Sequence, residues 1–263
     1  MSHLSVLLRP AILTMGDLDR APAENFADQV LYAIASWPGV AIEPSGSPRW
    51  ALVQQWLDNG TKVGIRALSL KTGEKVSADL VEPVVTVELE GGVTERFDAF
   101  EYFASRNRSQ GQASDHWDCL EVHYIGISER GAGKRLMEGH HAISKALARV
   151  LHKQKNRVLY LVLFTPTFHE VPRDFREVRG ADDELCATRD LIEAAEATLI
   201  EAYDPDLQGQ HEPAAIGSAL QHFEGVEVLV PTNGFRLRSR PTAFTQDFGG
   251  IWPYDKPAVL TLR

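Results

Sequence analysis

The feature that most constrains this chain is the run Arg157-Val-Leu-Tyr-Leu-Val-Leu-Phe164, which is apolar after its first residue. The run is far shorter than the ~20 apolar residues that a membrane-spanning helix needs, and its composition favours a buried β-strand. The segment before it, residues 134–155, has apolar side chains at helical spacing. We therefore expect a globular chain that combines helices with strands and does not cross a membrane.

The patterns around this run predict a compact module over residues 96–208. Strands are expected at 96–105, at 119–127 and at the run itself, a basic helix at 134–155, and a second helix from residue 182 or 183 to 203. This order of elements predicts an α+β fold, in which a small mixed or antiparallel sheet is flanked by helices.

The first 95 residues predict an additional α+β region. Apolar residues spaced by three and four positions predict a helix over residues 23–37, which Pro38-Gly39 ends. Short β-like runs separated by turns follow at 49–53, 62–66 and 81–89. Residues 209–263, with a strand at 226–230, are expected to form a C-terminal extension that packs on the module.

The distribution of charge is uneven. The formal net charge is −9, which argues against indiscriminate binding to nucleic acid. Residues 124–160 nevertheless carry eight Lys or Arg against two Asp or Glu. This basic segment predicts a local site for a polyanion, with a solvated helix face as the alternative.

The cysteine content and the N-terminus bear on the compartment. Cys119 and Cys186 are the two cysteines, which excludes a disulfide framework and a four-cysteine zinc site. The N-terminus lacks the basic start, long apolar core and small-residue cleavage site of a signal peptide. We therefore expect a cytoplasmic protein in a reducing environment.

An ordered set of short motifs runs through the module. The motifs are Tyr124-Ile-Gly-Ile-Ser128, Lys134-Arg-Leu136, His140-His141, Glu196-Ala-Thr-Leu-Ile200 and Tyr203-Asp-Pro205. Together they resemble the GIY-YIG nuclease family, in which a Tyr-Ile-Gly strand precedes an Arg and a His on one helix and a later Glu-x-x-Leu-Ile. The resemblance covers residues 96–208.

The chain departs from the family pattern at three places. It has no Gly-Ile-Tyr shortly before Tyr124, and the stand-in Ala99-Phe-Glu-Tyr-Phe103 would put Tyr102 in that role. The two histidines follow Arg135 by five and six residues, where the family has four, so the choice between them stays open. Gln208 stands where the family has an Asn.

The resemblance implies a metal-dependent endonuclease that hydrolyses phosphodiester bonds, of DNA rather than RNA. Glu196 would hold Mg²⁺ or Mn²⁺, and Arg135 would clamp the scissile phosphate. Tyr124 would handle the proton, together with Tyr102 or one of the histidines. Basic side chains of the 134–155 helix would contact nucleic-acid phosphates, namely Lys134, Lys145, Arg149 and Lys153.

The residue chemistry agrees with these roles and leaves structural alternatives open. Glu196 shares a helical stripe with Ile192 and Leu199, so its carboxylate needs a cation, which is either a metal ion or an arginine. Arg135 offers a planar fork of donors to phosphate oxygens, or it is a solvated first-turn residue. The tyrosine and histidine candidates have alternatives as well. Tyr124 would then be an aromatic residue of a strand that packs on a helix, His140 a histidine of the core, and His141 a histidine of the surface.

Two other functions remain open from the sequence. The first is a noncatalytic nucleic-acid-binding or sensor protein, which the missing Gly-Ile-Tyr suggests. The second is a cytosolic small-ligand or protein-interaction domain, which the acidic total suggests. Residues 1–95 are expected to supply target recognition or the contacts of a homodimer.

Overall fold

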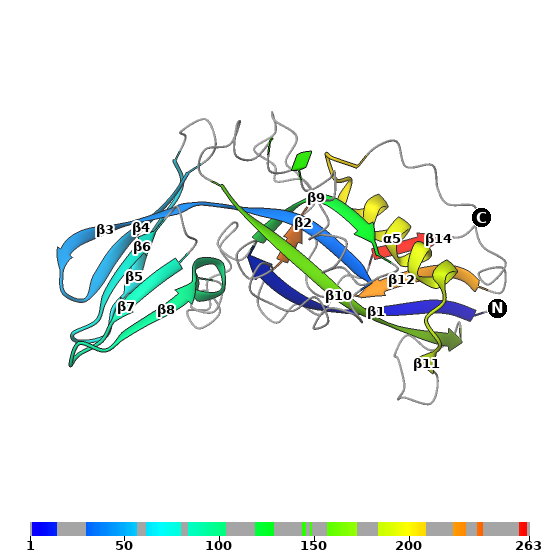
Figure 1. Cartoon of the computed structure of the whole chain (residues 1–263), viewed down its shortest axis with the longest axis horizontal. Helices are drawn as coiled ribbons and strands as arrows, with labels where there is room; N and C mark the ends of the chain where they lie inside the picture. Colours follow the sequence, from blue (N-terminus) through cyan, green and yellow to red (C-terminus); the bar gives the residue numbers. More distant parts are fainter. Residues whose placement is uncertain are drawn as a thin grey trace. The chain divides into compact units, whose positions relative to one another are not determined.

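The computed structural model describes residues 2–14, 30–56, 62–79, 84–103, 119–128, 144–145, 148, 157–172, 184–208, 223–229, 236–238 and 258–261. Contacts divide the chain into two compact units. The first unit comprises residues 1–35, 121–146 and 160–263, and the second comprises 36–120 and 147–159. The boundary expected near residue 95 therefore falls inside the second unit. Most of the described residues are in β-strands (Figure 1).

The larger sheet is built from segments that lie far apart in the sequence. Its order is β13 (Arg236–Arg238), β9 (Cys119–Ile127), β2 (Leu31–Pro38), β10 (Arg157–Pro172), β1 (Ser2–Thr14), β12 (Phe223–Leu229) and β14 (Ala258–Thr261). The short strand β11 (Glu184–Leu185) pairs with β10 outside this order. The sheet is mixed, because β1 runs antiparallel to β10 and parallel to β12. Strand β2 thus separates β9 from β10.

Strands β1 and β10 form the longest pairing of this sheet. Their register runs from Ser2 opposite Pro172 to Thr14 opposite Tyr160. The β10 residues from Tyr160 to Phe164 are all buried, and so are Leu4, Val6 and Leu8 of β1. A strand that is apolar at successive positions is buried on both faces, and the sheet order places β10 between two neighbours.

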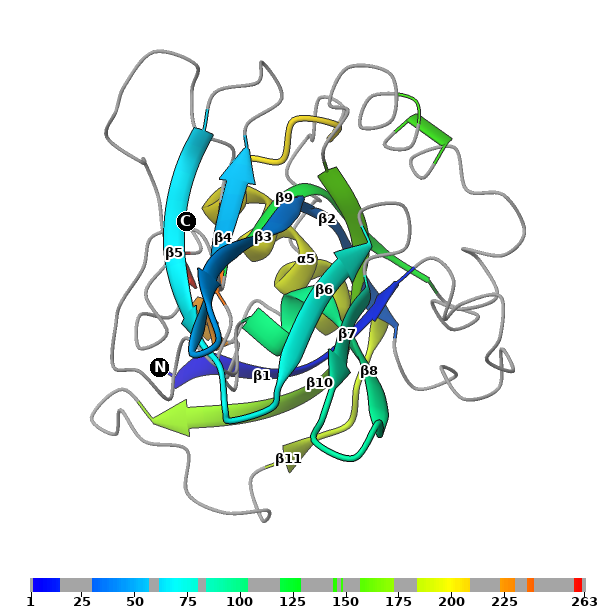
Figure 2. The ribbon, with the colours of Figure 1, turned by 90° about the vertical axis from the view of Figure 1, so that its left-hand side faces the viewer.

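The second unit contains two three-stranded antiparallel sheets (Figure 2). One has the order β3 (Val40–Ser47), β4 (Trp50–Trp56) and β5 (Lys62–Ser69). The other has the order β6 (Lys75–Asp79), β7 (Val84–Glu88) and β8 (Thr94–Asp98). Gly91 and Gly92 connect β7 to β8 with φ values of 96° and 79°, a conformation that favours glycine.

The expected helix over residues 23–37 is wrong where the structure describes it, because residues 31–38 form β2. Ile34, one of the periodic residues that suggested a helix, lies in an apolar run in which every side chain from Leu31 to Ala35 is buried. A continuous apolar run satisfies the helical and the extended period at once, so its period cannot distinguish them. Burial on both faces of a sheet decided the outcome.

The expected strand over residues 96–105 is only partly correct. Strand β8 ends at Asp98, and residues 99–103 are helical. The Asp98 carboxylate accepts a hydrogen bond from the backbone N–H of Glu101 at 2.9 Å, which is the bond of a helix N-cap. The buried faces of Phe100 and Phe103 then pack on the ring of Trp37.

Other expected strands are confirmed. The structure has strands at β4, β5 and β7, at β9 with the predicted limits of 119–127, and at β10 and β12. The expected fold class is wrong. The chain does not form a small sheet flanked by helices, because sheets dominate the described residues and one of them joins strands from both chain ends. Strands β1, β2 and β14 had no strand prediction, and they supply much of this larger sheet.

Helix α5 (Arg189–Tyr203) confirms the second predicted helix, with a later start. Thr188 caps its N-terminus and accepts a hydrogen bond from the N–H of Leu191 at 3.4 Å. Asp204 ends it in the left-handed conformation, with φ of 42°. The helix contacts β12 and β14 of the first unit. No helix within the described ranges has the length and apolar character needed to cross a bilayer.

Candidate functional site

Two tyrosines meet at Gly126 on the neighbouring strands β9 and β2. The ring centroids of Tyr124 and Tyr32 are 6.0 Å apart, with the planes tilted by 36°. A Cβ added at Gly126 would lie 2.7 Å from Tyr124 Cε1 and 2.9 Å from the Tyr32 hydroxyl oxygen. The absence of a side chain at Gly126 is therefore what allows both phenol rings to approach the backbone of β9.

The pairing of the strands explains this convergence. The N–H of Ser128 donates to the carbonyl of Val30 at 2.7 Å, two residues beyond Gly126 and two residues before Tyr32. Tyr124 lies two positions before Gly126, so its side chain projects from the same face of β9. Tyr32 is fully buried, whereas Tyr124 is partly exposed, so of the two residues Tyr124 is the more accessible to solvent.

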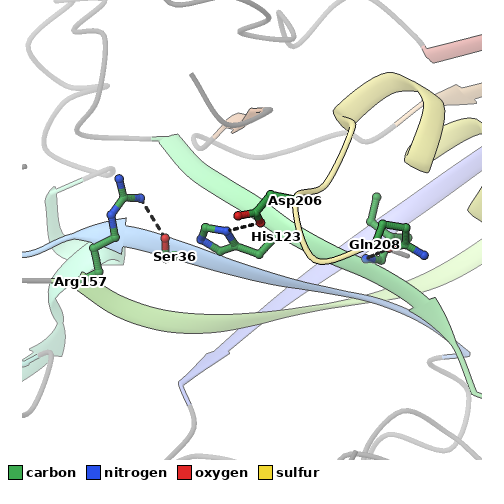
Figure 3. Close-up of polar contacts among 6 residues, drawn as sticks. Ser36, His123, Arg157, Asp206 and Gln208 are labelled. Atoms are coloured by element: carbon green, nitrogen blue, oxygen red, sulfur yellow. Dashed lines mark hydrogen bonds and ion pairs between the residues drawn. The ribbon is translucent and has the colours of Figure 1, made fainter. Parts of the chain in front are cut away.

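A buried His–Asp pair lies on the opposite face of β9. His123 Nδ1 is 3.0 Å from Asp206 Oδ1, and the two side chains are 2% and 13% exposed (Figure 3). Two further bonds join the segment after α5 to the same strand. The N–H of Leu207 donates to the His123 carbonyl at 2.9 Å, and the N–H of Ile125 donates to Gln208 Oε1 at 3.1 Å. These contacts connect α5 to the strand that carries Tyr124.

Glu196 lies on α5 at the edge of the buried helical face. The buried residues of this helix include Ala195 and Leu199, whereas Glu196 itself is partly exposed. The structure thus places its carboxylate between the core and the solvent, closer to the surface than the sequence pattern suggests. Among the residues that the structure describes, no three His, Cys, Asp or Glu side chains come close enough to hold a metal ion together.

Tyr102, the expected partner of Tyr124, belongs to an aromatic cluster of the second unit. Its ring is 7% exposed and contacts those of Phe97 and Phe103, with centroids 5.6 Å and 5.4 Å away. The phenol that contacts Tyr124 is instead that of Tyr32. The sequence pattern did not point to Tyr32, because residues 23–37 were predicted to form a helix. The continuous apolar run around Tyr32 was the sequence signal that could have indicated a buried strand.

Most of the expected basic residues lie outside the described ranges, namely Lys134, Arg135, His140, His141, Arg149 and Lys153. Lys145 is described, and it is helical and exposed. Arg157 of the same basic segment is also described. Its Nη1 donates to Ser36 Oγ at 3.0 Å, so this guanidinium already has a protein partner (Figure 3).

Sequence reasoning also missed His123 and Asp206, which are 83 positions apart. A histidine inside a strand pattern carries no signal beyond its place in β9. Asp206 follows Pro205 in a segment without periodicity, so no sequence pattern links it to His123. No family model matches this chain, and no curated protein or solved structure matches it significantly.

Proposed function

We propose that this protein is a divalent-metal-dependent nuclease that hydrolyses phosphodiester bonds, with DNA as its preferred substrate. The observation that carries the proposal is the convergence of Tyr124 and Tyr32 on Gly126, within a Tyr-Ile-Gly strand. In this proposal the role that the family resemblance assigned to Tyr102 passes to Tyr32. The metal ligand Glu196 and the phosphate clamp Arg135 are those that the GIY-YIG resemblance implies.

Phosphodiester hydrolysis needs a nucleophilic water, a group that accepts its proton, and positive charge beside the phosphoryl oxygens. Tyr124 is the partly exposed phenol, and it takes the proton. A free phenol titrates near pH ~10, so a cation beside the site is needed to make it a base at neutral pH. Tyr32 is buried against the same strand with its ring beside that of Tyr124, and its hydroxyl assists the proton transfer in the role first expected of Tyr102.

The positive charge comes from the basic segment of the chain. Residues 124–160 carry eight Lys or Arg against two Asp or Glu, in a protein whose net charge is −9. Arg135 clamps the scissile phosphate, because a guanidinium presents a planar fork of donors to phosphate oxygens. Lys145 is exposed on its helix and contacts another phosphate of the nucleic acid, further along its backbone.

The donor set fits a magnesium-type site. Mg²⁺ is usually bound through one or two carboxylates together with substrate phosphates and waters, so the single partly exposed carboxylate of Glu196 suffices. Mn²⁺ accepts the same oxygen ligands. When bound, such an ion polarises a phosphoryl oxygen and stabilises the charge of the leaving group. Glu196 would hold it, and the loop at 204–208 joins the helix of Glu196 to the strand of Tyr124.

The deciding experiment is cleavage of duplex DNA, single-stranded DNA and RNA, each with Mg²⁺ and with a chelator. We expect metal-dependent cleavage, strongest on duplex DNA. Glu196→Gln should lower the rate by about 100-fold or more, since it removes the charge of the metal ligand. The matched control is Glu201→Gln, an exposed carboxylate on the same helix, which should leave the rate within about twofold.

Other outcomes of this assay would contradict the proposal. Cleavage that persists in chelator, or that survives in Glu196→Gln, would refute the metal site. Tight, salt-sensitive DNA binding without cleavage would identify a noncatalytic nucleic-acid-binding protein. If the protein neither binds nor cleaves nucleic acid, the alternative of a small-ligand or protein-interaction domain remains.

A further inference from the structure

We propose that the His123–Asp206 pair is a clamp that fixes the helix of Glu196 to the strand of Tyr124, and that both residues are therefore positioning residues of the nuclease site. The inference rests on the proposed function for its catalytic consequence. Its mechanical part, which is the attachment of residues 204–208 to β9, rests on contacts alone.

The burial of the pair is the first argument. The side chains of His123 and Asp206 are 2% and 13% exposed, and their nearest polar atoms are 3.0 Å apart. Withdrawing a histidine and a carboxylate from water costs free energy unless the two groups satisfy each other. The buried pair therefore favours one position of the segment, because its displacement would leave the buried His123 side chain without this bond.

The bonds beside the pair are the second argument. Leu207 N donates to the carbonyl of His123, and Ile125 N donates to Gln208 Oε1, at 2.9 Å and 3.1 Å. These bonds hold β9 at the residues immediately before and after Tyr124. Its side chain projects from the other face of the strand, so the clamp orients Tyr124 through the backbone and does not obstruct it.

The short connection to α5 is the third argument. Asp204 donates its backbone N–H to the Ile200 carbonyl at 2.9 Å, and Gln208 N donates to the Pro205 carbonyl at 3.1 Å. Pro205 restricts the backbone between these two turns. The segment from the helix end to the strand contact therefore has little freedom. A clamped Asp206 fixes the end of α5, and Glu196 lies about two helical turns before that end.

The role assigned here is distinct from catalysis. His123 projects from the face of β9 opposite to Tyr124 and Gly126, and Asp206 meets it on that opposite face. The pair acts by fixing the distance between a proton acceptor on β9 and a metal ligand on α5. A displacement of about 1 Å in such a geometry can lower a rate by about 100-fold.

The test uses two substitutions at one position and a matched control. Asp206→Ala removes the acceptor, whereas Asp206→Asn keeps an oxygen that can accept from His123 Nδ1. The control is Glu224→Ala, because Glu224 faces His3 in a more exposed pair with a separation of 3.8 Å. All variants are compared by circular dichroism, so that a variant that does not fold is recognised.

Two readouts are measured on each variant. The first is hydrogen exchange at the amides of Leu207 and Ile125, without metal or substrate. We expect at least tenfold faster exchange in Asp206→Ala, and little change in Asp206→Asn and Glu224→Ala. The second is cleavage of duplex DNA. We expect Asp206→Ala to lower kcat by about tenfold or more at a nearly unchanged KM, with rescue by Asp206→Asn.

Each outcome supports or overturns the clamp. Unchanged exchange in folded Asp206→Ala would show that the pair does not hold the segment. Faster exchange with a normal kcat would show that the attachment has no catalytic role. If Asp206→Ala does not fold, Gln208→Ala takes its place. That substitution removes the acceptor of the Ile125 N–H, and the same two readouts are measured. A wild-type protein that cleaves nothing would refute the proposed function, and the exchange readout would then decide the mechanical part by itself.

Discussion

The substitution Gly126→Ala tests the tyrosine site most directly, because it inserts one methyl group between two phenol rings. The new Cβ would lie 2.7 Å from Tyr124 Cε1, 2.9 Å from the Tyr32 hydroxyl oxygen and 3.0 Å from Tyr32 Cζ. Carbon atoms in favourable contact are about 3.5–4.0 Å apart. The two rings must therefore move by roughly 0.5–1 Å to admit the methyl group.

The free-energy change can be worked from this geometry. Tyr32 has no exposed surface, so its ring can move only by displacing its neighbours. Overpacking of this kind costs about 1–3 kcal/mol. Gly126 does not have a positive φ, so the new side chain also restricts the unfolded chain and returns about 0.4–1 kcal/mol. The expected net loss of unfolding free energy therefore lies between about zero and about 2.6 kcal/mol.

The assay is urea unfolding of Gly126→Ala in the wild-type and the Tyr32→Phe backgrounds. Removal of the Tyr32 hydroxyl removes the 2.9 Å contact, so the cost of the methyl group should fall in the second background. Gly91→Ala is the control. Its Cβ would meet no atom within 4 Å and its φ is 96°, so its cost should be the same in both backgrounds.

The same displacement should affect the proposed chemistry. Movement of the Tyr124 ring by up to about 1 Å is expected to lower kcat for DNA cleavage by tenfold or more. A methyl group at residue 126 that costs the same free energy in both backgrounds would refute the packing of the two phenols on Gly126.

Two further predictions concern aromatic residues in the two units. Tyr32→Phe should lower kcat by about tenfold while Tyr102→Phe keeps it within about twofold, as measured by initial rates of DNA cleavage; the reverse order would return the role to Tyr102. Trp37→Ala removes a fully buried ring from the cluster of the second unit. It should cost about 3–5 kcal/mol in urea unfolding, and a cost near zero would contradict the packing described.

Local sequence patterns were sufficient for several elements that build the site. The β-branched composition of 119–127 predicted β9, and an acidic cap together with the Asp204-Pro205 stop predicted α5. Tyr124 and Glu196 were therefore placed on the correct kinds of element. Their burial and their neighbours were not predicted, since a period shows which face of an element is apolar and not what covers it.

Long-range pairing decided the rest. Residues 31–38 are compatible with a helix or a strand, and they became a strand because the larger sheet buries them between β9 and β10. That choice brought Tyr32 to Tyr124 and left Tyr102 in the aromatic cluster of the other unit. Likewise, Asp206 became the partner of His123 only when the segment after α5 met β9. The order of residues determined the local period and the candidate chemistry, whereas competition for burial among distant segments determined which side chains meet.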